Sequence, residues 1–281
     1  MLGVTRLKAD MRALARAFLA LGLLTAASGA PGAGQALEPS KPWVLDYADT
    51  QCVATRDYGS QESPITLGFS PSANGENYQI LLVQPGKGPT YGEQRQGSID
   101  FGKGPIEGWF LSFASGISKS TIFQFRIPSS EMAAARSASA IRINVRDGPD
   151  VSFRLYLMPQ LLDGLKDCVA NLIDYWNVGG EKNGRIATPA KGQVRKLFSS
   201  NDYPAEALSR WQEGSAQFLL LINEKGRVAG CQVLTASGSP ALDVMGCQVI
   251  RERAHFSPAL DPKGTPVRSA VVTPPVTWRM Q

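Results

Sequence analysis

Four cysteines and one histidine are the residues of this sequence whose chemistry is most easily recognised. Cys52 and Cys168 lie 116 positions apart, whereas Cys231 and Cys247 lie 16 positions apart. Neither spacing forms a Cys-x-x-Cys motif, and His255 is the only imidazole in the chain. The side chains that a zinc site or histidine-based catalysis requires are therefore not gathered. We predict no metal, no cofactor and no catalytic centre.

The first 36 residues have the pattern of an export signal. Arg6, Lys8, Arg12 and Arg16 precede an apolar run over residues 17–27, which ends in small residues typical of a cleavage site. The run is about half as long as the roughly 20 apolar residues of a membrane-spanning helix. We therefore predict a cleaved signal peptide over residues 1–36, with an uncleaved membrane anchor as the alternative.

Export changes the meaning of the cysteines and of the charge. An even number of cysteines in an exported chain favours disulfides, and we predict the pairs Cys52–Cys168 and Cys231–Cys247, with four buried free thiols as the alternative.

The formal net charge is +5. The export segment holds much of the excess, because the residues from Leu37 onward carry 25 basic and 23 acidic side chains. This nearly neutral chain gives no reason to expect nucleic acid as a partner.

Residues 41–176 are expected to form a mainly antiparallel β domain. Short β-branched or aromatic runs alternate with turns rich in Gly, Pro and Asn. A helix over 159–176 has apolar residues at spacings of three and four, so one face packs on the sheet, where Cys168 would reach the early strand that carries Cys52. The fold class is α+β, with a sandwich or barrel-like N-terminal domain. The strands are expected at residues 43–47, 65–70, 78–83, 109–113, 121–127, 141–145 and 151–157, and a short helix at 130–136.

No motif reveals the chemistry of this β domain. Trp43, Trp109 and Tyr91 would offer a stacking surface for peptidoglycan or another glycan, although the tryptophans are more simply explained as core residues. Four charged side chains near Cys52 would line a site, but a solvated strand end explains them equally well: Asp46, Asp49, Arg56 and Asp57. Residues 177–200 hold four glycines and five scattered basic residues and are expected to be a solvated linker.

From residue 202 onward, helices and strands alternate in a second domain over residues 201–281. Glu224-Lys-Gly226 supplies a hairpin turn in which Gly226 suits a positive φ. Pro274 and Pro275 must interrupt the pairing of the last strand, because proline has no backbone donor. An α-β-β-α-β order favours a three-stranded antiparallel sheet with two helices on one face. The expected elements are a helix over 205–210, strands over 216–223 and 227–235, a helix from Pro240 behind the cap Ser239, and a strand over 267–280.

This second domain resembles the C-terminal domain of the TonB family. Each matching element is weak alone, but they occur in the family's order over roughly 80 residues. They are Tyr203-Pro204-x-x-Ala207, Glu213-Gly214, Glu224-Lys-Gly-Arg227, Ser237-Gly238 with Leu242-Asp243, Phe256-x-Pro258-Ala259 and Pro275-Val-Thr-Trp278.

The resemblance implies that the domain binds an extended segment of outer-membrane TonB-dependent transporters and serves transport across the outer membrane. Recognition would be strand addition, in which the last strand offers unpaired backbone groups to the peptide. The chain would then face the periplasm. Peptidoglycan and a second copy of the chain stay open as further partners. The residues expected at the binding edge are Val267, Ser269, Val271, Thr273, Val276 and Trp278.

The sequence also departs from the family's energy-transducing members. Those members keep an N-terminal membrane helix and a long Pro-rich linker, whereas in this chain we predict an export signal and a folded β domain in that place. Three hypotheses follow: a periplasmic TonB-like binding protein, which we favour; an envelope scaffold that binds glycan through its β domain; and a membrane-anchored energy transducer if residues 1–36 are retained.

Overall fold

The computed structural model describes residues 35–89, 92–115 and 119–280. The predicted signal peptide lies outside these ranges except for Gln35 and Ala36, and Tyr91 also lies outside them. Within the described ranges, no helix combines the length and the apolar character needed to cross a membrane.

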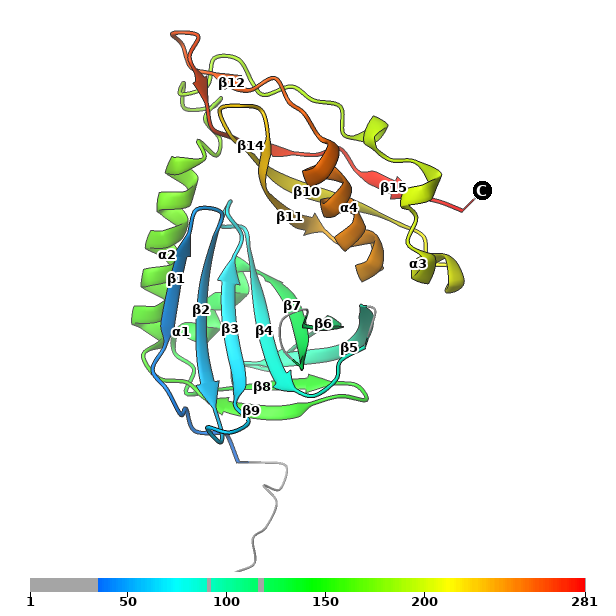
Figure 1. Ribbon diagram of the computed structural model, residues 1–281. Helices are drawn as coiled ribbons and strands as arrows, with labels where there is room; N and C mark the ends of the chain where they lie inside the picture. The colour runs from blue at the N-terminus through cyan, green and yellow to red at the C-terminus, as the bar shows by residue number, and fades with distance from the viewer. Residues whose placement is uncertain (1–34, 90–91, 116–118, 281) are drawn as a thin grey trace, which may run out of the picture. The chain divides into compact units, whose positions relative to one another are not determined.

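A nine-stranded, wholly antiparallel sheet forms the N-terminal domain (Figure 1). Its order is β1-β2-β3-β4-β7-β6-β5-β8-β9. All seven predicted strands are present, but β2 and β5 were not predicted because both are rich in polar and charged residues. The strands are β1 Val44–Ala48, β2 Gln51–Tyr58, β3 Ile65–Pro71, β4 Asn77–Pro85, β5 Glu93–Asp100, β6 Pro105–Ala114, β7 Ser120–Pro128, β8 Ala140–Val145 and β9 Asp150–Arg154.

The segment over residues 37–40 connects the two ends of this sheet. The amide of Leu37 donates to the carbonyl of Ser152 on β9 at 2.7 Å, and the amide of Ser40 donates to the carbonyl of Asp57 on β2 at 2.9 Å. The sheet therefore curls until β9 and β2 share one strand-like segment, which brings its two ends together in a barrel-like arrangement. The predicted barrel-like α+β fold is confirmed.

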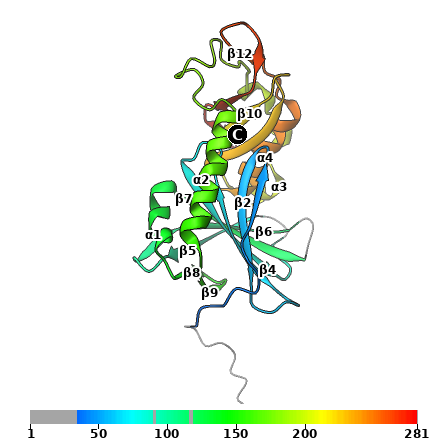
Figure 2. The ribbon, with the colours of Figure 1, turned by 90° about the vertical axis from the view of Figure 1, so that its left-hand side faces the viewer.

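Two helices accompany the sheet. A 3₁₀ turn, η1 Ser129–Glu131, leads into α1 Met132–Arg136, and α2 spans Met158–Tyr175. Figure 2 shows α1 and α2 side by side. The strand expected over 151–157 ends early, because Leu157 takes a left-handed φ of 62° directly before α2. Helix α2 packs against β1, β2 and β3, and the disulfide Cys52–Cys168 joins it to β2.

The two tryptophans of this domain differ in burial. Trp43 is half-buried and contacts Phe69, with the guanidinium of Arg56 over its ring. The side chain of Trp109 is 56% exposed, so its interpretation as a core residue is wrong. Asp57 binds Lys41 and Thr66 at 2.9 and 2.7 Å. These bonds tie strands together, so they favour the strand-end interpretation of the charged residues near Cys52.

Residues 177–200 are mostly exposed, but part of this segment is docked on the C-terminal domain. The segment around Thr188 pairs with Leu260, and Lys191 exchanges two backbone hydrogen bonds with Ser257 at 2.8 and 3.0 Å. Ile186 and Val194 are buried. The two 3₁₀ turns η2 Arg195–Leu197 and η3 Ser200–Asp202 follow. Residues 187–191 are therefore docked on the C-terminal domain through isolated backbone bridges, which the glycines and scattered charges of the segment did not indicate.

The C-terminal domain contains every helix and strand that the sequence predicted, but the strand expected over residues 267–280 is divided into shorter strands. The central strand β10 pairs with β11 on one side and with β14 and β15 on the other. Gly226 has a φ of 73° in the hairpin, as predicted. The elements are α3 Ala205–Ser209, β10 Gly214–Ile222, β11 Val228–Thr235, α4 Pro240–Arg253, β12 Ala259–Leu260, β13 Pro266–Val267, β14 Ser269–Val272 and β15 Val276–Trp278.

Helix α4 and the last strand share one core. A side chain at Gly246 would come within 2.4 Å of Phe218, so the absence of a Cβ lets α4 approach β10 closely. Trp278 packs edge-on against Phe198 and Tyr203. The disulfide Cys231–Cys247 joins β11 to α4, so both predicted pairings are present.

The two disulfides should contribute unequally to stability. They close loops of 116 and 16 residues. Loop-closure entropy predicts a loss of about 5 kcal/mol for Cys52→Ala/Cys168→Ala and about 3 kcal/mol for Cys231→Ala/Cys247→Ala. Urea unfolding of the two double variants measures the difference. An equal loss of stability in the two variants, or a larger loss for the 16-residue loop, would contradict the loop-closure explanation.

Candidate functional site

The last strand of the C-terminal domain forms an edge of its sheet. Strands β14 and β15 each pair with β10 and, within the described residues, with no other strand. The amide of Thr273 donates to the carbonyl of Phe218 on β10 at 2.9 Å. Because backbone groups of successive residues point to opposite sides of a strand, the groups of Ala270 and Val272 face away from β10. An extended peptide could pair with these outward groups.

Pro274 and Pro275 divide this edge into two parts. They lie between β14 and β15, where the ladder with β10 stops, so the predicted interruption is confirmed. Proline lacks a donor and fits a sheet only at an edge or an interruption. The four residues of β14 form the longer continuous part, and the outward groups of Ala270 and Val272 lie there.

The predicted edge residues fall into three groups. Val267 is not on this edge, because it belongs to β13 and pairs with Ala259; the last strand begins two residues later than expected. Val271 is half-buried and contacts the domain core. The other four lie on β14, on β15 or directly after β14, and their side chains are buried: Ser269, Thr273, Val276 and Trp278. These residues could offer a partner only their backbone, whereas Val272, which was not singled out, is 52% exposed.

The opposite edge of the sheet, at β11, is tied to the β domain. The side-chain oxygen of Gln232 accepts from the amide of Ala73 at 2.9 Å, and its nitrogen donates to the carbonyl of Thr50 at 3.3 Å. Arg126 donates to the carbonyl of Leu234 at 3.0 Å. Leu234 is the extra residue at one of the two places where the register with β10 shifts, and such bulges blunt an edge.

The face of the C-terminal sheet that points away from α4 is covered as well. Leu219 and Leu221 of β10 belong to the hydrophobic cluster of the β domain, together with Ala270 of β14. Arg268, directly before β14, places its guanidinium 3.9 Å from the ring centre of Tyr175 and binds Glu224 at 3.0 Å. With one face against α4 and the other against the β domain, the β14–β15 edge is the part of this sheet that no other described residue covers.

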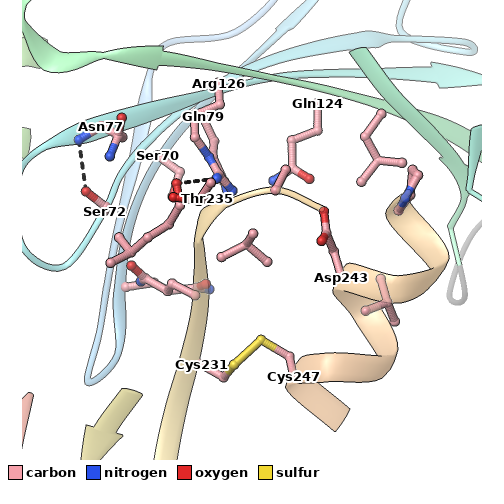
Figure 3. A pocket seen from close by; sticks show the side chains of 18 of the residues that line it. Ser70, Ser72, Asn77, Gln79, Gln124, Arg126, Cys231, Thr235, Asp243 and Cys247 are labelled. Atoms are coloured by element: carbon pink, nitrogen blue, oxygen red, sulfur yellow. Dashed lines mark hydrogen bonds between the residues drawn. A yellow bond between two sulfur atoms is a disulfide. The ribbon is translucent and has the colours of Figure 1, made fainter. Parts of the chain in front are cut away.

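A broad cleft lies beside the tied edge (Figure 3). Its volume is about 1190 Å³, and its walls come from the outer face of the β domain and from β11 and α4. Burial raises the pKa of the Asp243 carboxyl, which accepts from the amide of Ser237 at 2.8 Å. Burial likewise lowers the pKa of Arg126 on the other wall.

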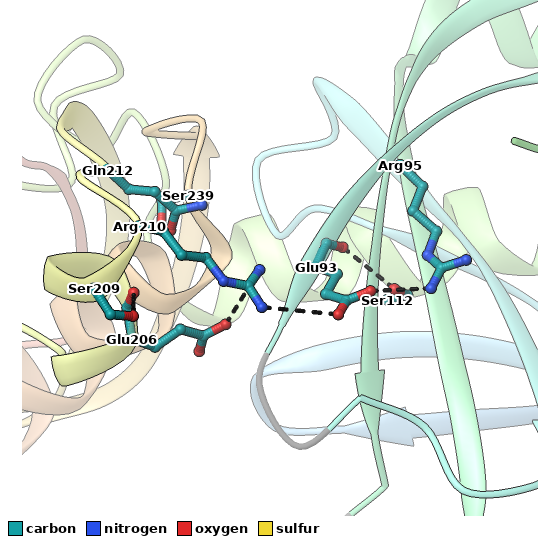
Figure 4. Close-up of polar contacts among 8 residues, drawn as sticks. All are labelled: Glu93, Arg95, Ser112, Glu206, Ser209, Arg210, Gln212 and Ser239. Atoms are coloured by element: carbon teal, nitrogen blue, oxygen red, sulfur yellow. Dashed lines mark hydrogen bonds and ion pairs between the residues drawn. The ribbon is translucent and has the colours of Figure 1, made fainter. Parts of the chain in front are cut away.

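A chain of charged residues connects α3 to the β domain (Figure 4). Arg210 lies 3.9 Å from a carboxylate oxygen of Glu93 and 3.7 Å from one of Glu206. Burial raises the pKa of Glu206 above its ordinary value. These long contacts orient the charges without the geometry of strong hydrogen bonds.

The comparisons with known proteins identify the C-terminal part. Residues 199–280 match the model of the family described as Gram-negative bacterial TonB protein C-terminal. This part of the chain therefore matches the TonB C-terminal domain, a family of non-enzymatic protein-interaction domains. No curated protein and no solved structure shows a significant match to the chain.

The residues of the cleft are those that sequence reasoning missed. Along β7, Gln124 and Arg126 alternate with the buried Phe123, Phe125 and Ile127, so they lie on the outer face of the β domain. Nothing in the sequence indicates that α4 stands opposite this face. The available signal was the number of amide side chains on outward positions, which include Gln79 and Gln94.

The ion pair between η3 and α4 should give the fold a measurable pH dependence. Arg253 binds both carboxylate oxygens of the buried Asp202 at 2.6 and 2.8 Å. Arg253, assisted by the Ser199 amide, holds the pKa of Asp202 far below its ordinary value. Its stabilisation is therefore present above about pH 4 and is lost as the pH falls further.

We expect Asp202→Asn to lower the melting temperature at pH 7 and to have a shrinking effect below about pH 4. The matched control is Asp163→Asn, which removes an exposed pair with Arg136 and should change little, because solvent screens such pairs. Thermal unfolding between pH 2 and pH 8 provides the comparison. A constant difference across this range, or an equal effect in the control, would contradict the role of the pair.

Proposed function

We propose that this protein is a periplasmic TonB-like binding protein. Its C-terminal domain holds an extended segment of an outer-membrane TonB-dependent transporter by strand addition on β14. The observation that carries this proposal is the free outer side of β14 in a domain whose two faces and other edge are all occupied. The backbone groups of Ala270 and Val272 would form the ladder with the peptide.

The shape of the edge supports a short, specific contact. The inward side chain of Thr273 helps to hold the strand in register, since its hydroxyl accepts from the amide of Phe218 at 3.1 Å. Val272 would give a partner one exposed apolar side chain beside the backbone ladder. Specificity would then come from alternate side chains of the incoming peptide, as in other forms of strand addition.

The location and the role in transport belong to the same proposal. A cleaved export segment would release the protein into the periplasm, whereas a retained segment would anchor it and return energy transduction as the function. N-terminal sequencing of the mature protein, with fractionation of the envelope, separates these two cases. The two disulfides support an oxidising compartment.

The test of strand addition changes the backbone of β14 alone. Val272→Pro removes an outward donor, while its pairing neighbours keep their bonds to β10. The probe is a synthetic TonB-box peptide from a transporter of the same organism, and binding is measured by calorimetry. Loss of one backbone hydrogen bond and the bulk of the proline ring should weaken binding about tenfold or more.

The matched control is Val272→Ala, which loses part of the side-chain contact but retains the donor, so it should weaken binding clearly less than Val272→Pro does. Deletion of the last strand is unsuitable, because Val276 and Trp278 belong to the domain core. Equal binding by Val272→Pro and the unaltered protein would overturn the proposal, provided that both have the same melting temperature.

A further inference from the structure

The cleft beside β11 has the size of a polymer site. Its volume of about 1190 Å³ exceeds the roughly 300–1,000 Å³ of most small-molecule pockets. A second cavity of about 420 Å³ adjoins it across strands β5, β6 and β8. Trp109 lines both cavities. A ligand could therefore continue from one cavity to the other over this ring.

Three glutamines form the floor of the larger cavity. Gln124 on β7 lies opposite Leu111 on β6, which in turn lies opposite Gln94 on β5. Gln79 on β4 is diagonal to Gln124, about 7–8 Å away in a regular sheet. Within the described residues, none of these three side-chain amides has a hydrogen-bond partner. Each has two donors and an acceptor to offer.

The floor also presents apolar surface between the amides. Leu111 separates Gln94 from Gln124 across neighbouring strands, and Trp109 pairs with Gln96 in the next outward row. The side chain of Trp109 is 56% exposed, so a broad aromatic face is available. A sugar ring has one apolar C–H face and a rim of polar groups, and this alternation of aromatic and amide side chains matches both.

Three of the four charged side chains that line the cleft already have hydrogen-bond partners. Arg126 donates to the carbonyl of Leu234, and the buried Asp243 accepts from the amide of Ser237. On α4, Glu252 accepts from the side chain of Gln248, and Arg251 lies beside it with the opposite sign. The free hydrogen-bonding capacity of the floor is therefore neutral, so a neutral ligand fits it better than an anion or a cation.

We propose that this cleft binds a neutral glycan chain with hydroxyl and acetamido groups. The glutamine amides would bond the polar groups, and Trp109 would stack on a sugar ring. An extended peptide is a poorer fit, because it would need free backbone groups on β11, and that edge carries a bulge and is tied to the β domain. This site is independent of the β14 edge.

Calorimetry with the full chain tests the proposal. The probe is the hexamer of β-1,4-linked N-acetylglucosamine; the glucose hexamer shows whether the acetamido groups matter, and soluble peptidoglycan fragments show whether the cell wall is the source. Trp109→Ala and Gln124→Ala should each weaken binding of the first hexamer at least tenfold. The matched controls are Trp211→Ala and Gln193→Ala, which change exposed residues outside both cavities and should leave binding unchanged.

Each outcome decides the proposal. Saturable binding that is lost in both cleft variants, with unchanged melting temperatures, supports it. Absence of binding by every saccharide at millimolar concentration overturns it, as does binding that survives Trp109→Ala and Gln124→Ala. Competition for the cleft by an extended peptide would overturn the assignment to glycan. The Val272→Pro variant should keep its glycan binding, so failure of one proposal is distinguishable from failure of the other.

Discussion

The structure depends on strand β10, which is apolar on both of its faces. Phe218, Leu220 and Ile222 enter the core beneath α4, whereas Leu219 and Leu221 enter the core of the β domain. A strand with this composition is stable only when both faces are buried, since exposure of either would cost several large apolar side chains. The two domains are therefore coupled through one strand.

This coupling determines what the C-terminal sheet can offer a partner. With both faces covered, binding is restricted to an edge, and Arg126 and Gln232 tie the edge at β11 to the β domain. The β domain thus limits recognition to β14 and β15, and it also creates the cleft. The connecting chain is fixed against the C-terminal domain by the pairing of Thr188 with Leu260 and by the ion pair between Asp202 and Arg253.

The sequence predicted the local structure well wherever one face of an element is buried. Strands with alternating residues, the amphipathic helix α2 and the elements of the TonB-like region all gave clear patterns. Strands β2 and β5 were missed because side chains such as Arg56 and Arg95 mask their alternation. The apolar run 218–222 was predicted to be a strand, but burial of both of its faces was not predicted.

Long-range features were harder to predict. The closure of the sheet by residues 37–40 depends on four backbone hydrogen bonds that leave no pattern in the sequence. The exposure of Trp109 depends on the position of its strand in the curled sheet. Both disulfides were predicted from the export pattern and from the even number of cysteines, which were the signals that linked cysteines far apart in the sequence. The edge was predicted as a region, whereas Val267 and Val272 show that its individual residues require the register.

Amide hydrogen exchange, followed by NMR with and without the TonB-box peptide, tests the central claim most directly. The claim is that β14 binds through the backbone groups that face away from β10. The amides of Ala270 and Val272 should exchange fast in the free protein and become protected with the peptide, while those of Ser269 and Val271 are protected in both. Protection that arises on β11 instead, or unchanged exchange at Ala270 and Val272 in a saturated complex, would contradict the account.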